Sequence, residues 1–298
     1  MIGVVFHGRL GNRLFQYAAA RTLAEDLETT LVCIEKSGSR NLKRVLCSST
    51  PQPLPDLNLK HNALATRSLN LTKNASPKSQ QLLIRKLFTH TFSPKRAIIS
   101  RGLSTEVFDE KFFLICDKTL LSGFFQSQAY FKHRSREVKE WFAESKSVKA
   151  KIDDLLKRSP VEVIDAVAIH IRLGDYKEHY LKIDGRAHPY NLQRDYYEAS
   201  IRFQGIERPL VLFSDSPNEA AKLLPKPPSW IFPDQPALDT LHAMSRFKRI
   251  VISNSSFSWW AGWLGDSEEI VCAPKFHSGR RPRIWSPDGI KVDGWKYF

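Results

Sequence analysis

The chain has 298 residues, of which 42% are hydrophobic and 26% are charged, and its formal net charge is +14. This profile is typical of a globular protein too long for one small core, so two domains are expected. The apolar runs are strand-sized, which excludes a membrane span, and the N-terminus begins as a strand, so no secretory signal is expected. The four cysteines lack CxxC spacing, which argues against a zinc site or a disulfide scaffold.

The positive charge is concentrated in residues 36–101, which hold 13 Lys and Arg against one acid, Asp56. Such a field attracts nucleic acid, anionic lipid or an anionic substrate, and a solvated face without a partner is the alternative. Residues 79–90 have the pattern of a short basic amphipathic helix. We expect docking on an anionic membrane surface, because the few aromatic side chains in this segment do not favour nucleic acid.

In the first half, strand-like runs and breaker-free helical segments can be recognised, whereas residues 35–80 are rich in Ser, Asn, Pro and basic residues. Strands are predicted at 2–6 and 31–34, and a strand followed by a turn around 122–127. Helices are predicted at 14–27 and 130–156, the last either continuous or interrupted near Ser145. The Arg158-Ser159-Pro160 punctuation predicts a domain boundary. The two domains are therefore expected to span residues 1–158 and 159–298.

The second half alternates strands and helices more regularly, which indicates a parallel α/β sheet. Strands are predicted at 165–172, 210–213, 249–253 and 269–273, and helices at 195–203, 218–224, 240–247 and 258–264. Two such α/β halves around a cleft would bind a ligand at the carboxyl ends of their strands.

The segment His170-Ile171-Arg172-Leu173-Gly174-Asp175-Tyr176 places Arg172 at such a strand end. The planar guanidinium suits phosphate oxygens, and strand alternation puts His170 on the same face. Asp175 could pair with Arg172 or accept a proton. A purely structural Arg–Asp pair explains the same pattern and remains open.

Three further stretches carry candidate ligand contacts. The glycine-containing turn 8–12 precedes a helix, whose N-terminus favours an anion, but it is not GxGxxG, so a nicotinamide cofactor is rejected. The serine-rich turn 253–258 also precedes a helix. Asp215 follows a strand and could bind base or sugar groups, or cap the next helix. Asp-x-Asp is absent, so no metal clamp is expected.

Four motifs in order resemble the family-11 glycosyltransferases, which include the α-1,2-fucosyltransferases. They are GRLGNRLFQYAAA (8–20), GFFQSQAYF (123–131), HIRLGDY (170–176) and SNSSFSWWAGWL (253–264). The resemblance covers most of the chain. It implies a GT-B fold with two Rossmann-like domains facing a central cleft, an acceptor-side N-terminal domain, and a GDP-sugar-binding C-terminal domain. It also implies GDP-fucose as donor, inversion at the anomeric carbon and no required metal.

By resemblance, Arg172 binds the donor phosphates, with further donor contacts on both sides of the cleft. These expected contacts are Gly8, Arg9, Gly11, Asn12, Asp215, Asn254, Ser255, Ser256, Phe257 and Ser258. Leu173 and Arg13 depart from the family, which usually has a second Arg and a Gln there, and Arg9 could supply the missing phosphate contact. If the acceptor hydroxyl needs a base, the candidates are Asp175, Glu178 and, less favoured, His170.

The expected function is therefore transfer of L-fucose from GDP-fucose to a glycan hydroxyl, namely O2 of a terminal galactoside. A lipid-linked acceptor and a bacterial cytoplasmic enzyme, peripheral on the inner membrane face, fit the basic segment. Another linkage or another GDP-sugar is the alternative within the class. A nucleic-acid-binding or non-catalytic carbohydrate-binding protein is the alternative outside it, disfavoured by the four catalytic-family motifs.

Overall fold

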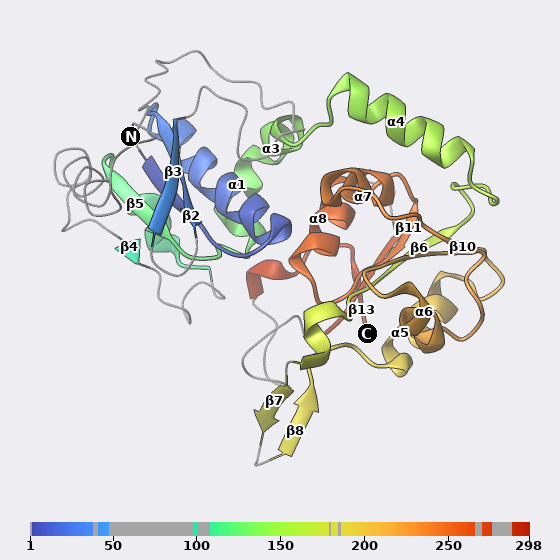
Figure 1. The fold of residues 1–298 in the computed structure, drawn as a ribbon. Coiled ribbons are helices and arrows are strands. Elements are labelled where there is room, and N and C mark those ends of the chain that lie inside the picture. The colour runs from blue at the N-terminus through green and yellow to red at the C-terminus, as the bar shows by residue number, and fades with distance from the viewer. Residues whose placement is uncertain are drawn as a thin grey trace. The chain divides into compact units, whose positions relative to one another are not determined.

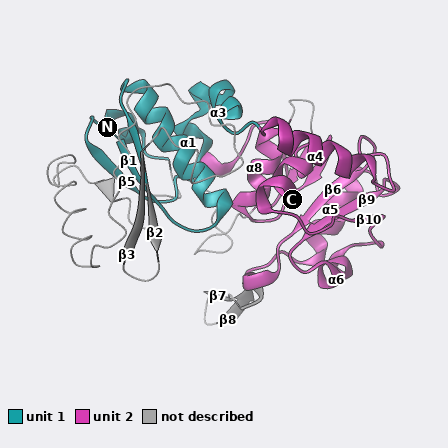
Figure 2. Ribbon diagram, turned by 45° about the horizontal axis from the view of Figure 1, so that its top comes forward, with its two compact units in different colours: residues 1–143 teal, residues 144–298 magenta. Residues whose placement is uncertain are grey.

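The computed structural model describes residues 2–37, 41–47, 98–99, 108–178, 180–183, 186–265, 270–275 and 288–298. The chain divides into two compact units, residues 1–143 and 144–298 (Figure 2). The helix expected at 79–90 lies outside the described residues. In the described part of the chain, no helix is long and apolar enough to cross a membrane.

Unit 1 is built on a five-stranded sheet (Figure 1). Its strands are β1 (Ile2–Phe6), β2 (Leu31–Ser37), β3 (Asn41–Cys47), β4 (Ile98–Ile99) and β5 (Thr119–Ser122). Its helices are α1 (Leu10–Asp26) and α3 (Ser135–Trp141), and its 3₁₀ turns are η2 (Glu110–Leu114), η3 (Gln128–Tyr130) and η4 (Lys132–Arg134).

The order of this sheet is β3-β2-β1-β5-β4, and β1 runs parallel to both of its neighbours. All five residues of β1 are buried, as expected for a continuous apolar run in a parallel sheet. The chain leaves β1 toward β2 and later returns to β5 on the other side of β1. The carboxyl ends of β1 and β5 therefore form a topological switch point, the place where open α/β sheets bind ligands.

Unit 2 contains a six-stranded sheet with helices between its strands, and a separate two-stranded hairpin. The sheet strands are β6 (Val167–Ile171), β9 (Leu210–Ser214), β10 (Trp230–Ile231), β11 (Arg249–Val251), β12 (Ile270–Ala273) and β13 (Lys296–Tyr297), and the hairpin strands are β7 (Tyr180–Ile183) and β8 (Arg186–Pro189). The helices are α4 (Lys146–Lys157), α5 (Arg194–Gln204), α6 (Pro217–Ala220), α7 (Ala237–Met244) and α8 (Ser256–Leu264), with 3₁₀ turns η5 (Gly174–Glu178), η6 (Ala221–Leu223) and η7 (Asp288–Ile290).

The six strands of unit 2 are all parallel and lie in the order β10-β9-β6-β11-β12-β13. With β6 counted first, this is the Rossmann order 3-2-1-4-5-6. The order reverses between β6 and β11, so the segments that follow these two strands flank the switch point. The expectation of an α/β chain with two domains built on mainly parallel sheets is confirmed.

The helix expected over residues 130–156 is interrupted. It is replaced by short 3₁₀ turns, α3 and α4, and the Ser145 side chain caps α4 by accepting a hydrogen bond from the Val148 amide at 3.3 Å. The helix expected at 218–224 is one α-turn followed by a 3₁₀ turn. The helix expected at 240–247 instead spans Ala237–Met244.

The division between the units falls after Ala143, earlier than the expected boundary after residue 158. The reason is that α4 and the segment before it contact α7 and the residues after it. Glu144 accepts a hydrogen bond from Arg246, and its Oε2 lies 3.2 Å from His242 Nδ1, while Lys151 pairs with Asp239 at 2.5 Å. These contacts place α4 in unit 2.

Candidate active site

Arg172 follows the last residue of β6, and its guanidinium lies between two carboxylates. Its NH2 group donates to Asp175 Oδ1 at 2.5 Å, and its NH1 group pairs with Asp215 Oδ2 at 2.6 Å. Asp215 follows β9, the strand next to β6. The arginine side chain is 18% exposed, so the guanidinium is fixed in a partly buried position at the carboxyl edge of the sheet.

The two carboxylates are held very differently. Asp215 Oδ1 also accepts the Leu173 backbone N–H at 3.0 Å, and its Oδ2 lies where a Cβ on Gly174 would stand. Asp175 is on a one-turn 3₁₀ helix, and its side chain is 41% exposed against 27% for Asp215. Asp215 is therefore built into the strand ends as the group that orients Arg172, whereas Asp175 lies on a short turn and is the more exposed of the two carboxylates.

Tyr176 packs beside the guanidinium and was not among the residues expected from the sequence. The Arg172 Cζ atom lies 5.6 Å from its ring centroid, a cation–π distance. The Tyr176 hydroxyl donates to the Asn254 carbonyl at 3.3 Å, and its ring meets Tyr190 edge-on at 4.5 Å. Tyr176 thus joins the segment after β6 to the segment after β11. The position of Tyr176 in the motif HIRLGDY marked it as a candidate, but the sequence alone does not show which residues its side chain contacts.

The serine-rich segment after β11 forms the start of α8. The Ser255 hydroxyl accepts the Phe257 N–H at 3.3 Å and caps the helix. Ser258 is buried and donates to the carbonyls of Ser253 and Ser255 at 3.4 and 3.2 Å. These bonds hold the backbone at the N-terminus of α8, where the N–H groups of the first turn point outward and the helix dipole favours an anion.

Asn254 is buried within this turn, and its Nδ2 donates to the Tyr190 carbonyl at 2.9 Å. Its Oδ1 has no hydrogen-bond partner in the described structure. Ser256 is partly buried at the first position of α8. The expected donor contacts Asn254 to Ser258 are therefore gathered in one cap at the same sheet edge as Arg172.

His170 lies under this cap. It is buried, shares a 2.7 Å hydrogen bond between its Nδ1 and Ser253 Oγ, and packs its ring against Phe257 at 5.3 Å. Burial lowers the pKa of His170 to about 4, so the ring is neutral near neutral pH. These contacts support the cap, and a catalytic role for His170 stays a prediction.

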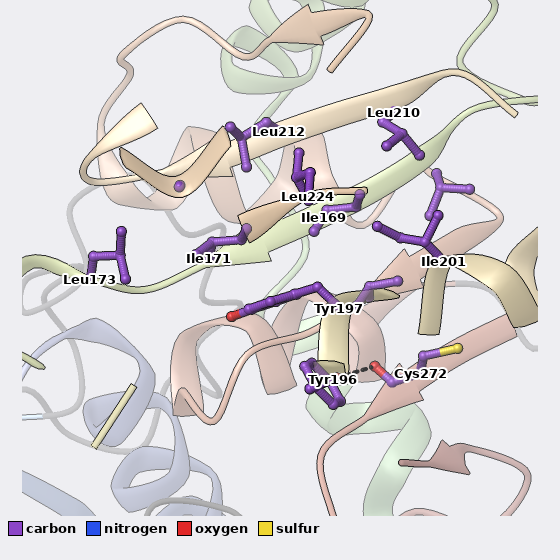
Figure 3. Close-up of a cluster of buried hydrophobic side chains, with 13 residues drawn as sticks. Ile169, Ile171, Leu173, Tyr196, Tyr197, Ile201, Leu210, Leu212, Leu224 and Cys272 are labelled. Carbon is purple, nitrogen blue, oxygen red and sulfur yellow. Dashed lines mark hydrogen bonds between the residues drawn. The ribbon is translucent and has the colours of Figure 1, made fainter. Parts of the chain in front are cut away.

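Leu173 occupies the position where the family usually has a second arginine. Its side chain is buried in the apolar core with Ile171 and Tyr197 (Figure 3). With this backbone, a side chain at residue 173 points into the core rather than toward the partners of Arg172. Because residue 173 is a leucine, Arg172 is the one arginine of this motif, and its side chain lies at the sheet edge.

The expected site residues of unit 1 form a separate group at the carboxyl end of β1. Gly8 has a φ of +73°, a left-handed conformation that favours glycine, and an added Cβ there would collide with Asn12 Nδ2. Asn12 Oδ1 accepts from Gln126 Nε2 at 2.8 Å. Arg9 is at the N-cap position of α1, and Gly11 is buried in the first turn of that helix. Gln126 was not expected from the sequence as a partner of this loop.

Of the remaining expected residues, Glu178 ends the turn η5, and its side chain lies outside what the structure describes. Within the described ranges, no three His, Cys, Asp or Glu side chains are grouped as metal ligands. Metal-free catalysis and the roles of Asp175 and Glu178 as bases stay predictions.

A Rossmann-type sheet with an arginine and a helix N-terminus at its switch point defines a protein suited to a nucleotide or another phosphorylated ligand. The family model described as glycosyl transferase family 11 matches residues 1–298. The chain belongs to glycosyl transferase family 11, which confirms the resemblance drawn from the four motifs, and it is a glycosyltransferase.

Two curated relatives come from Escherichia coli. The chain is 25% identical over 317 residues to the O-antigen biosynthesis glycosyltransferase WbnK, with 97% of each chain covered. It is 25% identical over 275 residues to an alpha-1,2-colitosyltransferase, covering 86% of this chain and 85% of the relative. Among solved structures, the fucosyltransferase NodZ from Bradyrhizobium aligns with a TM-score of 0.47 and 14% identity over 89% of this chain and 92% of NodZ.

Proposed function

We propose that the protein is an inverting fucosyltransferase that moves L-fucose from GDP-fucose to O2 of a terminal galactoside, without a metal. The observation that carries this proposal is the position of Arg172 at the switch point of unit 2, beside the capped N-terminus of α8. Membership of glycosyl transferase family 11 and the motif resemblance support GDP-fucose as the proposed donor.

In this mechanism the acceptor oxygen attacks the anomeric carbon, and GDP leaves with the electron pair of the broken glycosidic bond. Negative charge then grows on the β-phosphate. Arg172 and the amides near Ser255 and Ser256 neutralise it in a water-poor site, where such preorganised donors contribute most. The diphosphate competes with Asp175 for the guanidinium, and a displaced Asp175 carboxylate is available to take the proton of the acceptor hydroxyl.

A second donor is favoured by one relative. The alpha-1,2-colitosyltransferase from Escherichia coli matches over 86% of this chain. Colitose is fucose without its 3-hydroxyl, so the two GDP-sugars share the diphosphate that Arg172 would bind. A colitosyltransferase is therefore the alternative function, and it would use the same site chemistry.

The test is a donor panel with lactose and methyl β-galactoside as acceptors, measured with and without EDTA. The donors are GDP-fucose, GDP-colitose, GDP-mannose and UDP-galactose, and NMR of the product gives its linkage and anomeric configuration. We expect an α-1,2-linked fucoside that forms equally in EDTA. Preference for GDP-colitose would establish the alternative, and activity that requires added manganese would overturn the metal-free mechanism. Transfer from UDP-galactose alone would overturn the donor assignment.

A further inference from the structure

The turn that follows β5 belongs to the motif GFFQSQAYF, and the donor site does not account for it. Its two phenylalanines are adjacent, but one is buried and the other is exposed. Phe125 is buried against Phe112 and Tyr130, with ring centroids 5.9 and 5.5 Å away. Phe124 is 37% exposed.

This arrangement has a conformational cost. Phe125 has a φ of +51°, the left-handed region, which is a genuine outlier for a bulky residue. Strain of this kind clusters at functional sites. The turn buries the Phe125 ring and leaves Phe124 exposed.

The His7 ring, which lies beside Phe124, is itself held in place. The ring lies edge-on to Phe124 at 6.3 Å, and His7 Nε2 shares a 3.2 Å hydrogen bond with Ser122 Oγ at the end of β5. The buried Gln16 side chain bonds both the backbone N–H and the carbonyl of His7, at 3.0 and 3.3 Å. A buried amide thus fixes the residue that follows β1.

The same surface is tied to the glycine turn of unit 1. Gln126 Nε2 donates to Asn12 Oδ1 at 2.8 Å, which joins the second motif to the first. Since β1 and β5 are neighbouring parallel strands with Val5 opposite Ser122, all these side chains lie at the switch point of unit 1.

We propose that this surface, formed by Phe124, His7, Gln126 and Asn12, binds the terminal pyranose of the acceptor glycan. An exposed aromatic ring stacks on the C–H face of a sugar, and amide and imidazole groups can both donate to and accept from its hydroxyls. The side chains of Phe124, Gln126 and Asn12 carry no charge, which suits a neutral sugar. This inference rests on the proposed function, and it assigns Asn12 to the acceptor, whereas the family resemblance implied a donor contact for it.

The experiment compares Phe124→Ala and Phe124→Trp with the wild-type chain, using lactose and methyl β-galactoside as probes. Loss of the stacking ring should raise the acceptor KM about tenfold, the size typical of one lost aromatic anchor, while the donor KM is unchanged. Phe124→Trp keeps a stacking surface and should keep the wild-type acceptor KM. The matched control is Phe113→Ala, because Phe113 is 43% exposed in the same unit. It should leave both KM values unchanged.

Saturation-transfer NMR with the same two galactosides measures acceptor binding without turnover. If no GDP-sugar is transferred but galactoside binding is lost in Phe124→Ala and kept in Phe113→Ala, the proposed function fails and this surface stands. If transfer proceeds and Phe124→Ala retains the wild-type acceptor KM, the surface is wrong and the function stands. Equal losses in Phe124→Ala and Phe113→Ala would also overturn the proposal.

Discussion

Arg172 and Asp215 lie 43 residues apart in sequence, yet their side chains form an ion pair of 2.6 Å at the ends of the adjacent strands β6 and β9. The sequence suggested Asp215 as a contact for a base or sugar, or as a helix cap. In the structure its partners are the Arg172 guanidinium and the Leu173 amide, and its contact with the donor stays a prediction. The orientation of the expected phosphate ligand thus depends on a carboxylate from another strand.

The different attachment of the two carboxylates predicts opposite effects on GDP binding. Asp215→Asn should weaken GDP binding, because the neutral amide no longer holds the guanidinium. Asp175→Asn should bind GDP at least as tightly, because a charge that competes with the diphosphate is gone. If Asp175 is also the base, kcat of that variant should fall about 100-fold or more. Titration calorimetry with GDP and steady-state kinetics measure both effects.

The matched control for this comparison is Asp154→Asn on α4, because Asp154 also pairs with an arginine, Arg158, at 2.5 Å. That pair is surface-exposed, so its loss should change neither GDP affinity nor kcat. Weaker GDP binding by Asp175→Asn than by Asp215→Asn would reverse the assignment of the fixed and the replaceable carboxylate.

The substitution Gly174→Ala is expected to impair GDP binding rather than folding. A Cβ there would overlap Asp215 Oδ2 and approach Arg172, so Gly174→Ala must displace the carboxylate. We expect a folded protein with weakened GDP binding. In a double-mutant cycle, Gly174→Ala should add little to Asp215→Asn, because both act on the same ion pair. Full additivity of the two losses would show that Gly174 acts by another route.

The pH dependence of stability should reflect the two buried histidines of unit 2. Burial lowers the pKa of both His170 and His242 to about 4 from an ordinary value of 6.5. The unfolded chain therefore takes up protons first as the pH falls. Their contribution to stability is complete above about pH 6.5 and declines progressively toward pH 4.

Melting temperatures measured across this range should fall less steeply for His170→Asn than for the wild type. NMR of the His170 ring should show a neutral imidazole at pH 6. A ring that titrates near 6.5 would contradict its buried position, and it would restore His170 as a candidate base.

Membrane docking by the basic segment 36–101 is a separate proposal, motivated by 13 basic residues against one acid. Each Lys or Arg near an anionic surface contributes on the order of 1 kcal/mol, and salt screens the attraction. Co-sedimentation should occur with vesicles that contain anionic phosphatidylglycerol and not with pure phosphatidylcholine vesicles. Equal binding to both, or to neither, would remove the proposal.

The sequence predicted the parallel strands well because buried strands such as Val167–Ile171 and Leu210–Ser214 are continuous apolar runs. It did not predict β3, β7 and β8, which form antiparallel hairpin pairs with little apolar patterning. The two-residue strand β10 is recognisable only from its pairing with β9.

The candidate site could be predicted only in part. Arg172 and the serine-rich cap were visible as motifs at strand ends. The bonds from Asp215 to Arg172, from Tyr176 to Asn254, and from Gln126 to Asn12 connect residues far apart in the chain. Strand order decides such contacts, and periodicity does not reveal which strands are neighbours. The domain boundary differs from the predicted one for the same reason. The ion pair between Lys151 and Asp239 joins α4 to α7, so α4 belongs to unit 2.

The central claim is that Arg172 stabilises the leaving diphosphate, and Arg172→Lys tests it most directly. Lysine keeps the charge but loses the planar fork, so the variant should fold and lose roughly 100- to 1,000-fold in kcat, as for removal of one preorganised donor. Arg158→Lys, at the exposed pair on α4, is the matched control and should keep its kcat. The steady-state kcat, the single-turnover rate constant and the melting temperature of both variants decide the question. A folded Arg172→Lys enzyme with wild-type kcat, or one that merely melts earlier, would show that Arg172 is only a structural partner of Asp175 and Asp215.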